Sequence, residues 1–191
     1  MTSSDAAGTQ GFVKGPERVV HRGRVIEVVV GEYTSPTGES FERDLLHHPG
    51  AVCAVPLDGD EVIFVRQFRA PLNRALLEIP AGIRDVADEP PEETAARELV
   101  EEIGMVPGKL EHLCGFYNAP GYADEHITIF LATDLEPTEP QAHGAEEQQM
   151  TVERVRLDDI DGLIASGELC DAKSLIGLLL VKQRLERVKH G

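Results

Sequence analysis

The 191-residue sequence is poor in basic residues and cysteine and has no long apolar run. Its 18 lysines and arginines stand against 34 aspartates and glutamates, so the formal net charge is −16. This charge repels phosphate backbones and anionic membrane surfaces, so we expect neither nucleic-acid nor membrane binding. No stretch reaches the roughly 18 apolar residues of a membrane-spanning helix, and residues 1–11 lack the features of a secretory signal. The three cysteines form no C-x-x-C pair, which favours a reducing cytoplasm.

The composition, 41% hydrophobic and 27% charged, is that of an ordinary globular protein, and the length suits one main domain of roughly 100–200 residues. Residues 1–16 show no periodicity and are predicted to form a mobile tail. Residues 17–50 are expected to supply N-terminal strands, and residues 51–191 the main domain. The sequence shows no internal repeat.

Alternating and continuous apolar runs predict strands over residues 25–30, 41–46, 51–57, 61–69, 110–116, 126–132 and 151–157. Asp58-Gly59 predicts a hairpin between two of them. Helices are predicted over residues 92–103, with Gly104 as the stop, over 172–188, with Asp171 as the N-cap, and more weakly over 157–166. Strands, a helix, more strands and a final helix indicate an α+β fold with a mixed sheet.

The helix predicted from residue 92 has an acidic face. At 100° per residue, Glu98, Glu101 and Glu102 fall within about 100° of one another, opposite an apolar arc. Three such carboxylates repel one another unless a cation lies among them, and oxygen ligands suit Mg²⁺ or Mn²⁺. Taken alone, this pattern is more typical of a solvated acidic helix face than of a metal site.

The surrounding string GIRDVADEPPEETAARELVEEIGM, which starts at Gly82, resembles the Nudix box of the Nudix hydrolases, G-x5-E-x7-R-E-U-x-E-E-x-G-U. Six residues rather than five separate Gly82 from Glu89; the remainder matches without a gap. The resemblance implies metal binding by Glu98, Glu101 and Glu102, helped by the backbone carbonyl of Ala81. It also implies three structural features: an ion pair between Glu89 and Arg97, a close backbone approach at Gly82, and the stop at Gly104.

Flanking segments are similar to those of the ADP-ribose pyrophosphatases within this family. They are residues 65–69, 77–82 and 118–125, together with Arg43-Asp44. The resemblance implies Mg²⁺- or Mn²⁺-dependent hydrolysis of ADP-ribose to AMP and ribose 5-phosphate, on an α/β/α sandwich with a mixed central sheet. It further implies a homodimer in which residues 17–50 take part. The substrate-binding residues that it implies are Arg43, Asp44, Arg69, Pro120, Gly121 and Glu125.

The base that activates water is expected on a loop just before the strand at residue 151. Glu146 is the first choice and Glu147 the second, with Glu102 also in the catalytic set; His143 is an alternative. Other substrates stay open: NADH, a sugar nucleotide such as GDP-mannose, or an oxidised nucleotide. A non-catalytic Nudix ligand sensor is a further alternative. His47 and His48 are expected to be ordinary surface or strand-end histidines, because adjacent strand residues point in opposite directions.

Overall fold

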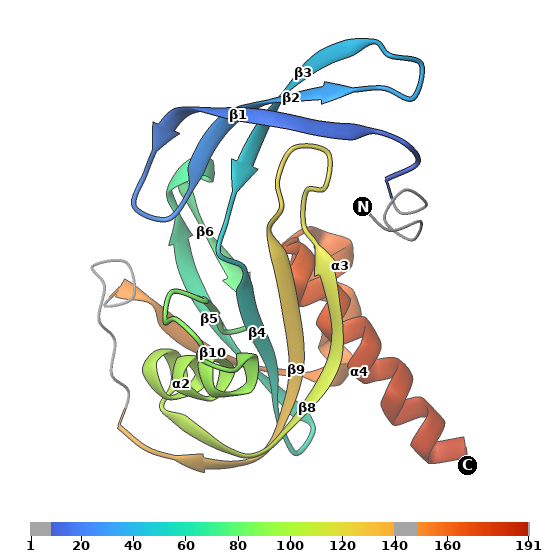
Figure 1. The fold of residues 1–191 in the computed structure, drawn as a ribbon. Helices are drawn as coiled ribbons and strands as arrows, with labels where there is room; N and C mark the ends of the chain where they lie inside the picture. The colour runs from blue at the N-terminus through green and yellow to red at the C-terminus, as the bar shows by residue number, and fades with distance from the viewer. Residues whose placement is uncertain (1–8, 140–148, 191) are drawn as a thin grey trace. The chain divides into compact units, whose positions relative to one another are not determined.

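The computed structural model describes residues 9–139 and 149–190, which form two compact units (Figure 1). Unit 1 contains the described part of residues 1–50 together with Tyr117–His126. Unit 2 contains Ala51–Phe116 and the described residues from Ile127 onward. The division therefore falls at residue 50, and the segment Tyr117–His126 joins the N-terminal part.

Unit 1 is built on an antiparallel sheet of β1 (Val13–Arg22), β2 (Glu27–Thr34) and β3 (Ser40–His47), in that order. The predicted tail of residues 1–16 extends too far, because β1 already begins at Val13. Gly15-Pro16 concealed this strand, since both residues usually interrupt strands. The structure accommodates them at a shift of register between Lys14 and Glu17.

Unit 2 holds a mixed sheet in the order β10-β5-β4-β9-β8, with β6 paired to β5 and β7 paired to β4. Strand β4 runs parallel to β9 and antiparallel to β5 and β7, which confirms the mixed sheet. The predicted hairpin at Asp58-Gly59 joins β4 to β5, and Gly59 has a φ of +64°. The strands are β4 (Ala51–Asp58), β5 (Glu61–Arg69), β6 (Arg74–Glu78), β7 (Ala81–Ile83), β8 (Met105–Tyr117), β9 (His126–Pro137) and β10 (Thr151–Arg156).

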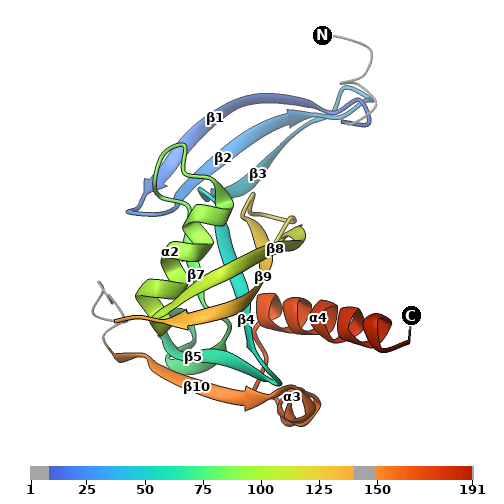
Figure 2. The same cartoon turned by 90° about the horizontal axis from the view of Figure 1, so that it is seen from below.

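Helices cover both faces of this sheet, as Figures 1 and 2 show for α2 and α4. Successive residues of β4 point to opposite faces. Val52 and Ala54 pack in one core cluster with side chains of α2, whereas Cys53 and Val55 pack in the other with side chains of α4. The α/β/α sandwich is thereby confirmed. The helical segments are η1 (Ala70–Leu72), α2 (Pro91–Ile103), η3 (Leu157–Asp159), α3 (Ile160–Ser166) and α4 (Ala172–His190).

The predicted C-terminal stop of one helix and the predicted N-cap of another are both present. Gly104 adopts a left-handed conformation, with φ of 63°, and its N–H donates to the carbonyls of Leu99 and Val100. At the start of α4, the carboxylate of Asp171 accepts a hydrogen bond from the backbone N–H of Ser174 at 3.0 Å. No helix in the described residues is both long and apolar enough to span a membrane.

Candidate metal and diphosphate site

Strand β7 and helix α2 bring the residues of the Nudix-like motif together in unit 2. Strand β7 is held against β4, with Cys53 opposite Ala81 and Val52 opposite Gly82. Helix α2 packs through Ala95, Leu99 and Ile103 in the core cluster that also contains Val52. One face of α2 therefore packs on the sheet, and Glu98 and Glu102 of the same helix lie next to β7.

Glu102 lies buried beside β7, with 8% of the residue exposed. Its Oε2 accepts a hydrogen bond from the backbone N–H of Ala81 at 3.0 Å. Burial, followed by the nearby charge of Glu98, raises the pKa of Glu102 to about 8. Both causes disfavour the ionised carboxylate. A cation bound beside it would offset them and lower the pKa again.

Gly82 allows a close approach of Glu98. A Cβ atom added to Gly82 would lie 1.9 Å from Cδ and 2.0 Å from Oε1 of Glu98, far inside van der Waals contact. Any other residue would displace that carboxylate, which explains the glycine. The carboxyl groups of Glu98 and Glu102 therefore lie against two neighbouring residues of β7, Gly82 and Ala81 respectively.

Arg97 organises the remaining carboxylates. Its guanidinium donates to both oxygens of Glu89 at 3.3 Å, to Glu98 at 2.9 Å and to Glu101 at 3.1 Å. These contacts, the hydrogen bonds with Glu89 first, raise the pKa of Arg97 and keep it charged. Thr94 adds a 2.7 Å hydrogen bond to Glu89. The ion pair expected between Glu89 and Arg97 is present, and it fastens the loop after β7 to α2.

The donor set suits a hard cation, although its carboxylates do not converge on one point. Among the described residues, no three His, Cys, Asp or Glu side chains are arranged to hold an ion together. Arg97 draws Glu98 and Glu101 toward itself, whereas Glu102 is bound to β7. Oxygen ligands on one helix face, beside a backbone that only glycine allows them to reach, still fit a divalent cation.

A second charged cluster links β5, β6 and α4, and the sequence did not predict it. Glu78, only 2% exposed, accepts two hydrogen bonds from Arg69 at 2.6 and 2.7 Å and a short one from Lys173. Lys173 also donates to Asp171 at 2.9 Å. Burial alone would raise the pKa of Glu78, but the hydrogen bonds and charges of Arg69 and Lys173 outweigh it and lower the pKa.

Ser174 links this cluster to the segment before β7. Its hydroxyl donates to Asp171 at 2.6 Å and accepts the backbone N–H of Ile79 at 2.9 Å. Of the expected substrate contacts, Arg69 lies in unit 2. Its Nε and Nη2 donate hydrogen bonds to the carboxylate of Glu78. Nη1 takes no part in that pair.

The other expected substrate contacts lie in unit 1. Arg43 stacks over the ring of Phe41 at 4.5 Å, and Asp44 follows it on β3. Pro120, Gly121 and Glu125 lie in residues 118–125, called the Pro-Gly loop below. Backbone hydrogen bonds between Leu46 and this loop bring the loop to the end of β3. The expected base, Glu146 or Glu147, and the alternative His143 lie outside the described residues.

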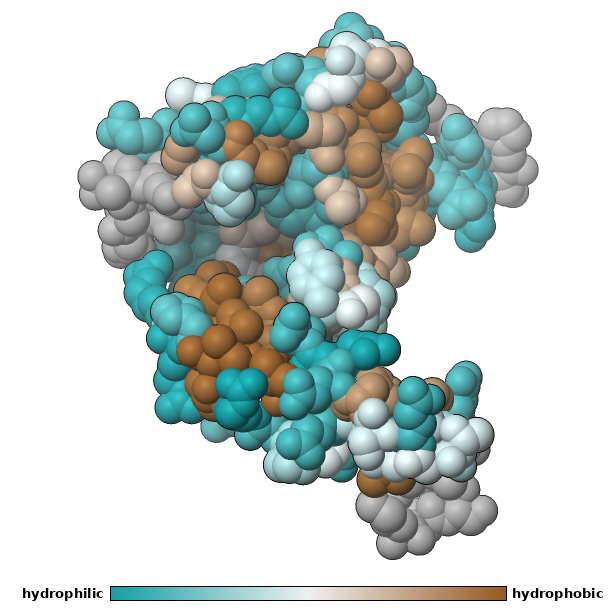
Figure 3. Space-filling view, turned by 90° about the horizontal axis from the view of Figure 1, so that it is seen from above, coloured by the Kyte–Doolittle hydropathy of each residue, from teal (hydrophilic) through white to brown (hydrophobic). Residues whose placement is uncertain are grey.

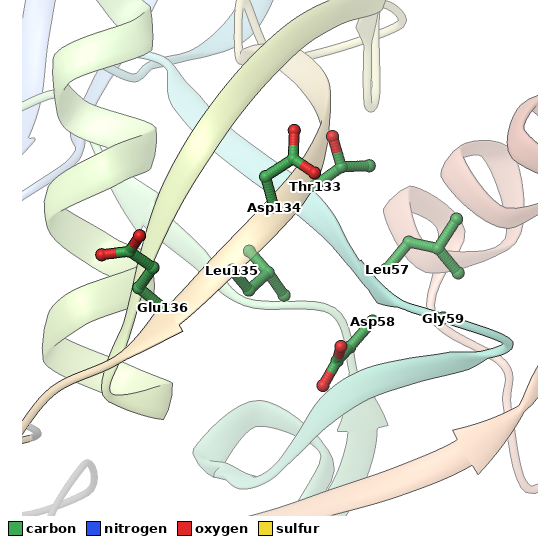
Figure 4. A pocket seen from close by; sticks show the side chains of 7 residues that line it. All are labelled: Leu57, Asp58, Gly59, Thr133, Asp134, Leu135 and Glu136. Atoms are coloured by element: carbon green, nitrogen blue, oxygen red, sulfur yellow. The ribbon is translucent and has the colours of Figure 1, made fainter.

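A cavity of about 480 Å³ in unit 2 has the wrong charge for a diphosphate. It is lined by the β4–β5 hairpin and by the C-terminal part of β9 (Figure 4). Asp58, Asp134 and Glu136 contribute carboxylates to its wall, and none of its lining residues is basic. An anionic substrate would be repelled there. The acidic helix α2 contributes no residue to this wall.

Comparisons with known proteins agree with the sandwich and with the motif on α2. The NUDIX domain family matches residues 47–176, more than half of the chain. The chain therefore belongs to the NUDIX family, and it is a Nudix hydrolase.

Two relatives and one solved structure narrow the comparison. An ADP-ribose pyrophosphatase of Bacillus subtilis is 38% identical over 173 residues, which cover 89% of this chain and 93% of that protein. An ADP-ribose pyrophosphatase of Mycobacterium tuberculosis is 35% identical over 164 residues, covering 85% and 79%. The crystal structure of an ADP compounds hydrolase superimposes with a TM-score of 0.81 and 25% identity, over 93% of this chain and 95% of that one.

Proposed function

We propose that this protein hydrolyses the diphosphate bond of ADP-ribose to AMP and ribose 5-phosphate with the help of Mg²⁺ or Mn²⁺. The observation that carries the proposal is that Glu98 and Glu102 of α2 lie against Gly82 and Ala81, two neighbouring residues of β7. Two relatives that match most of this chain and are named ADP-ribose pyrophosphatases support the choice of substrate.

The carboxylates of Glu98, Glu101 and Glu102, with the carbonyl of Ala81, are the proposed metal ligands. A divalent cation held there would neutralise negative charge on the diphosphate and would make water a better nucleophile near neutral pH. The chain's own residues prepare this site. Ala81 orients Glu102 through its N–H, Gly82 admits Glu98, and Arg97 fixes the loop through Glu89.

The substrate contacts are proposed at Arg43, Asp44, Arg69 and, in the Pro-Gly loop, Pro120, Gly121 and Glu125. Arg69 would present Nη1 to a phosphate oxygen while Glu78 holds its other edge, because a guanidinium fixed in this way loses little entropy on binding. The buried Lys173 shares Glu78 with Arg69 and stabilises this arrangement.

Glu146 is the proposed general base, with Glu147 as the second choice and His143 as the alternative. Carboxylates bound to a cation are poor proton acceptors, so a separate group should take the proton from water. Glu146→Gln is expected to lower kcat by roughly 10²- to 10⁴-fold with little change in substrate binding. If neither Glu146→Gln nor Glu147→Gln slows the chemical step, this assignment is wrong. A pH–rate profile with an apparent pKa near 6.5 would favour His143.

A substrate panel tests the proposed activity. Purified protein is incubated with ADP-ribose, NADH, GDP-mannose and an oxidised nucleoside diphosphate, with Mg²⁺, with Mn²⁺ and with a chelator, and the products are separated by chromatography. We expect kcat/KM for ADP-ribose to exceed the other values by at least about tenfold, equivalent to roughly 1.4 kcal/mol. An equal kcat/KM for ADP-ribose and another substrate, or a higher value for another substrate, refutes the assignment of ADP-ribose. If no compound in the panel is hydrolysed, the result favours a non-catalytic ligand sensor.

We also propose a homodimer in which the strands of residues 17–50 take part, in a reducing compartment such as the cytoplasm. Strand β1 exposes Val13, Val19 and Val20, each about half accessible, and every residue of this strand is exposed. Figure 3 shows hydrophobic side chains gathered in patches on the face seen from above. Sedimentation velocity of the wild type and of Val20→Glu tests the dimer: a wild-type monomer refutes it. The three free cysteines fit the compartment.

A further inference from the structure

His47 is held between two carboxylates from distant parts of the chain. Its Nδ1 lies 2.5 Å from Oδ2 of Asp124 in the Pro-Gly loop, and its Nε2 lies 3.2 Å from Oε2 of Glu17 on β1. Both partners belong to unit 1. His47 is the last residue of β3, as expected, but the sequence did not predict its two carboxylate partners.

The contacts determine the protonation state of the ring. Ionised carboxylates only accept hydrogen bonds, so the ring makes both contacts as hydrogen bonds only when both of its nitrogens carry a proton, that is, as an imidazolium. The hydrogen bond with Asp124 is the main cause that raises the pKa of His47. Partial burial acts against ionisation of Asp124, but the hydrogen bonds from His47 and from the backbone of His48, together with the charge of His47, outweigh it and lower the pKa of Asp124.

Asp124 is the point at which the Pro-Gly loop is anchored. Its Oδ1 accepts the backbone N–H of His48 at 2.8 Å, while Oδ2 faces His47. The backbone N–H of Asp124 donates to the carbonyl of Leu46 at 3.2 Å, and the N–H of Leu46 donates to Tyr122 at 2.8 Å. The charged link to His47 therefore adds to a short stretch of main-chain bonds.

The same ring forms part of the wall beneath Pro120 and Gly121. A cavity of about 260 Å³ in unit 1 is bordered by His47 and Asp124, by Pro120 and Gly121, and by Lys14 and Tyr33. Movement of the ring or of Asp124 would change the wall that supports the loop. The loop's conformation and the state of His47 are thus coupled by geometry.

We propose that His47 is a positioning residue, whose imidazolium ties the Pro-Gly loop to β1 and holds that loop in its substrate-binding conformation. The inference rests on the proposed function, because the loop's contact with ADP-ribose is part of that proposal. His47 itself touches no substrate in this scheme. It acts through Asp124.

The charged groups around His47 decide which link is lost when the ring is neutral. On β1, Lys14 forms a 2.6 Å ion pair with Glu17, so Glu17 keeps a partner. On β2, Tyr33 borders the cavity and Glu27 lies opposite His47 in register, while Arg22 pairs with Glu27 at 2.5 Å. In the loop, Glu125 lies 3.9 Å from Nε2 of His48. The neutral ring retains one donor, and the shorter contact to Asp124 keeps it.

The sign of the pH effect follows. The pKa of His47 is raised by its partners, so the complete tie is present below that pKa and is lost as pH rises through it. Above it, the link to Glu17 is broken, and the link to Asp124 changes from a charge-assisted to a neutral hydrogen bond. We expect KM for ADP-ribose to rise roughly three- to tenfold, while kcat changes little, because the loop binds substrate and performs no chemistry.

The variant His47→Asn tests whether the effect of pH on KM comes from titration of the His47 ring. In His47→Asn, the side-chain amide can donate from the place of Nδ1 to Asp124 but cannot titrate. We expect its KM to stay level from pH 6 to pH 9, whereas the wild-type KM rises. His21→Asn, the same change on β1 of the same sheet, is the matched control and should keep the wild-type profile. A His47→Asn profile identical to that of the wild type, or an effect confined to kcat, overturns the inference.

A measurement without substrate separates this inference from the proposed function. In ¹H–¹⁵N spectra, the backbone amide of Asp124 should titrate together with the His47 ring, and this titration should vanish in His47→Asn. An Asp124 amide that ignores the ring overturns the tie, even if ADP-ribose is cleaved. If the amide titrates but KM does not change with pH, the positioning role is refuted. If ADP-ribose is not cleaved at any pH, the proposed function fails, and the spectra still decide the tie.

Discussion

Replacing Gly82 with alanine tests the metal site through one methyl group. The new Cβ would lie 1.9 Å from Cδ of Glu98, and an ordinary contact is about 3.4 Å, so the carboxyl group must retreat by about 1.5 Å (3.4 − 1.9). The φ of Gly82 is not in the left-handed region, so alanine brings no backbone strain there. The change acts on Glu98 and leaves the core intact.

The expected loss is large because metal ligands tolerate displacements of only about 0.2 Å. A misplacement of about 1 Å at a reacting centre costs roughly 100-fold in rate, which is about 2.7 kcal/mol of transition-state stabilisation. We expect Gly82→Ala to lower kcat/KM for ADP-ribose by at least that factor and to raise the Mg²⁺ concentration at half-maximal rate. Initial rates of AMP formation across an Mg²⁺ titration measure both quantities.

Gly162→Ala is the matched control. Gly162 lies in α3, and a Cβ there would meet nothing within 4 Å, so its activity should equal that of the wild type. If Gly82→Ala acts through Glu98, it should cost nothing further in a Glu98→Ala background. Wild-type kcat/KM and metal dependence in Gly82→Ala would refute the reasoning, as would full additivity with Glu98→Ala.

Three further outcomes concern stability. Because the pKa of Glu102 is raised to about 8, the metal-free protein should lose stability as pH rises from about 4.5 to 8; Mg²⁺ or Glu102→Gln should remove this loss, as thermal melts at pH 5 and pH 8 can show. Lys173→Met should cost roughly 3 kcal/mol in urea unfolding, because it strips a partner from the buried Glu78, whereas Arg184→Met at an exposed ion pair should cost under about 1 kcal/mol. Gly177→Ala should lower the melting temperature despite alanine's better helix propensity, since its Cβ would come within 2.8 Å of a β4 side chain.

The sequence predicts the elements whose signal is local. The continuous apolar runs of β4 and β5, the hairpin at Asp58-Gly59 and the stop at Gly104 each depend on residues within a few positions. The acidic helix is predicted for the same reason, since its three glutamates share a face whatever surrounds it. These features form the sandwich and one half of the candidate site.

Elements that depend on distant partners escaped prediction. Strands β6 and β7 are only five and three residues long, and they exist because β5 and β4 offer them hydrogen bonds. Strand β1 contains Gly15-Pro16 and is exposed along its length, so it has no alternating apolar pattern to read. In each case, a non-local pairing overrides the weak local preference.

The charged contacts escaped for a related reason. Glu78 and Lys173 are 95 positions apart, and His47 and Asp124 are 77 positions apart. A lysine near the start of a helix or a histidine at the end of a strand is common, so neither position carries a signal by itself. Their roles arise only when the sheet brings a buried carboxylate to one and a loop aspartate to the other.

The segment from Ile79 to Gly82 is held from both faces of the sheet, and this explains how α4 can influence the acidic helix. From the α4 side, Ser174 accepts the N–H of Ile79. Within the sheet, the carbonyl of Pro80 accepts the N–H of Ala54 at 3.1 Å. From the α2 side, Glu102 binds the N–H of Ala81, and Glu98 lies against Gly82. Three backbone groups in this short segment are bound by α4, β4 and α2 in turn, so a shift at the start of α4 can reach the glutamates through four residues of chain.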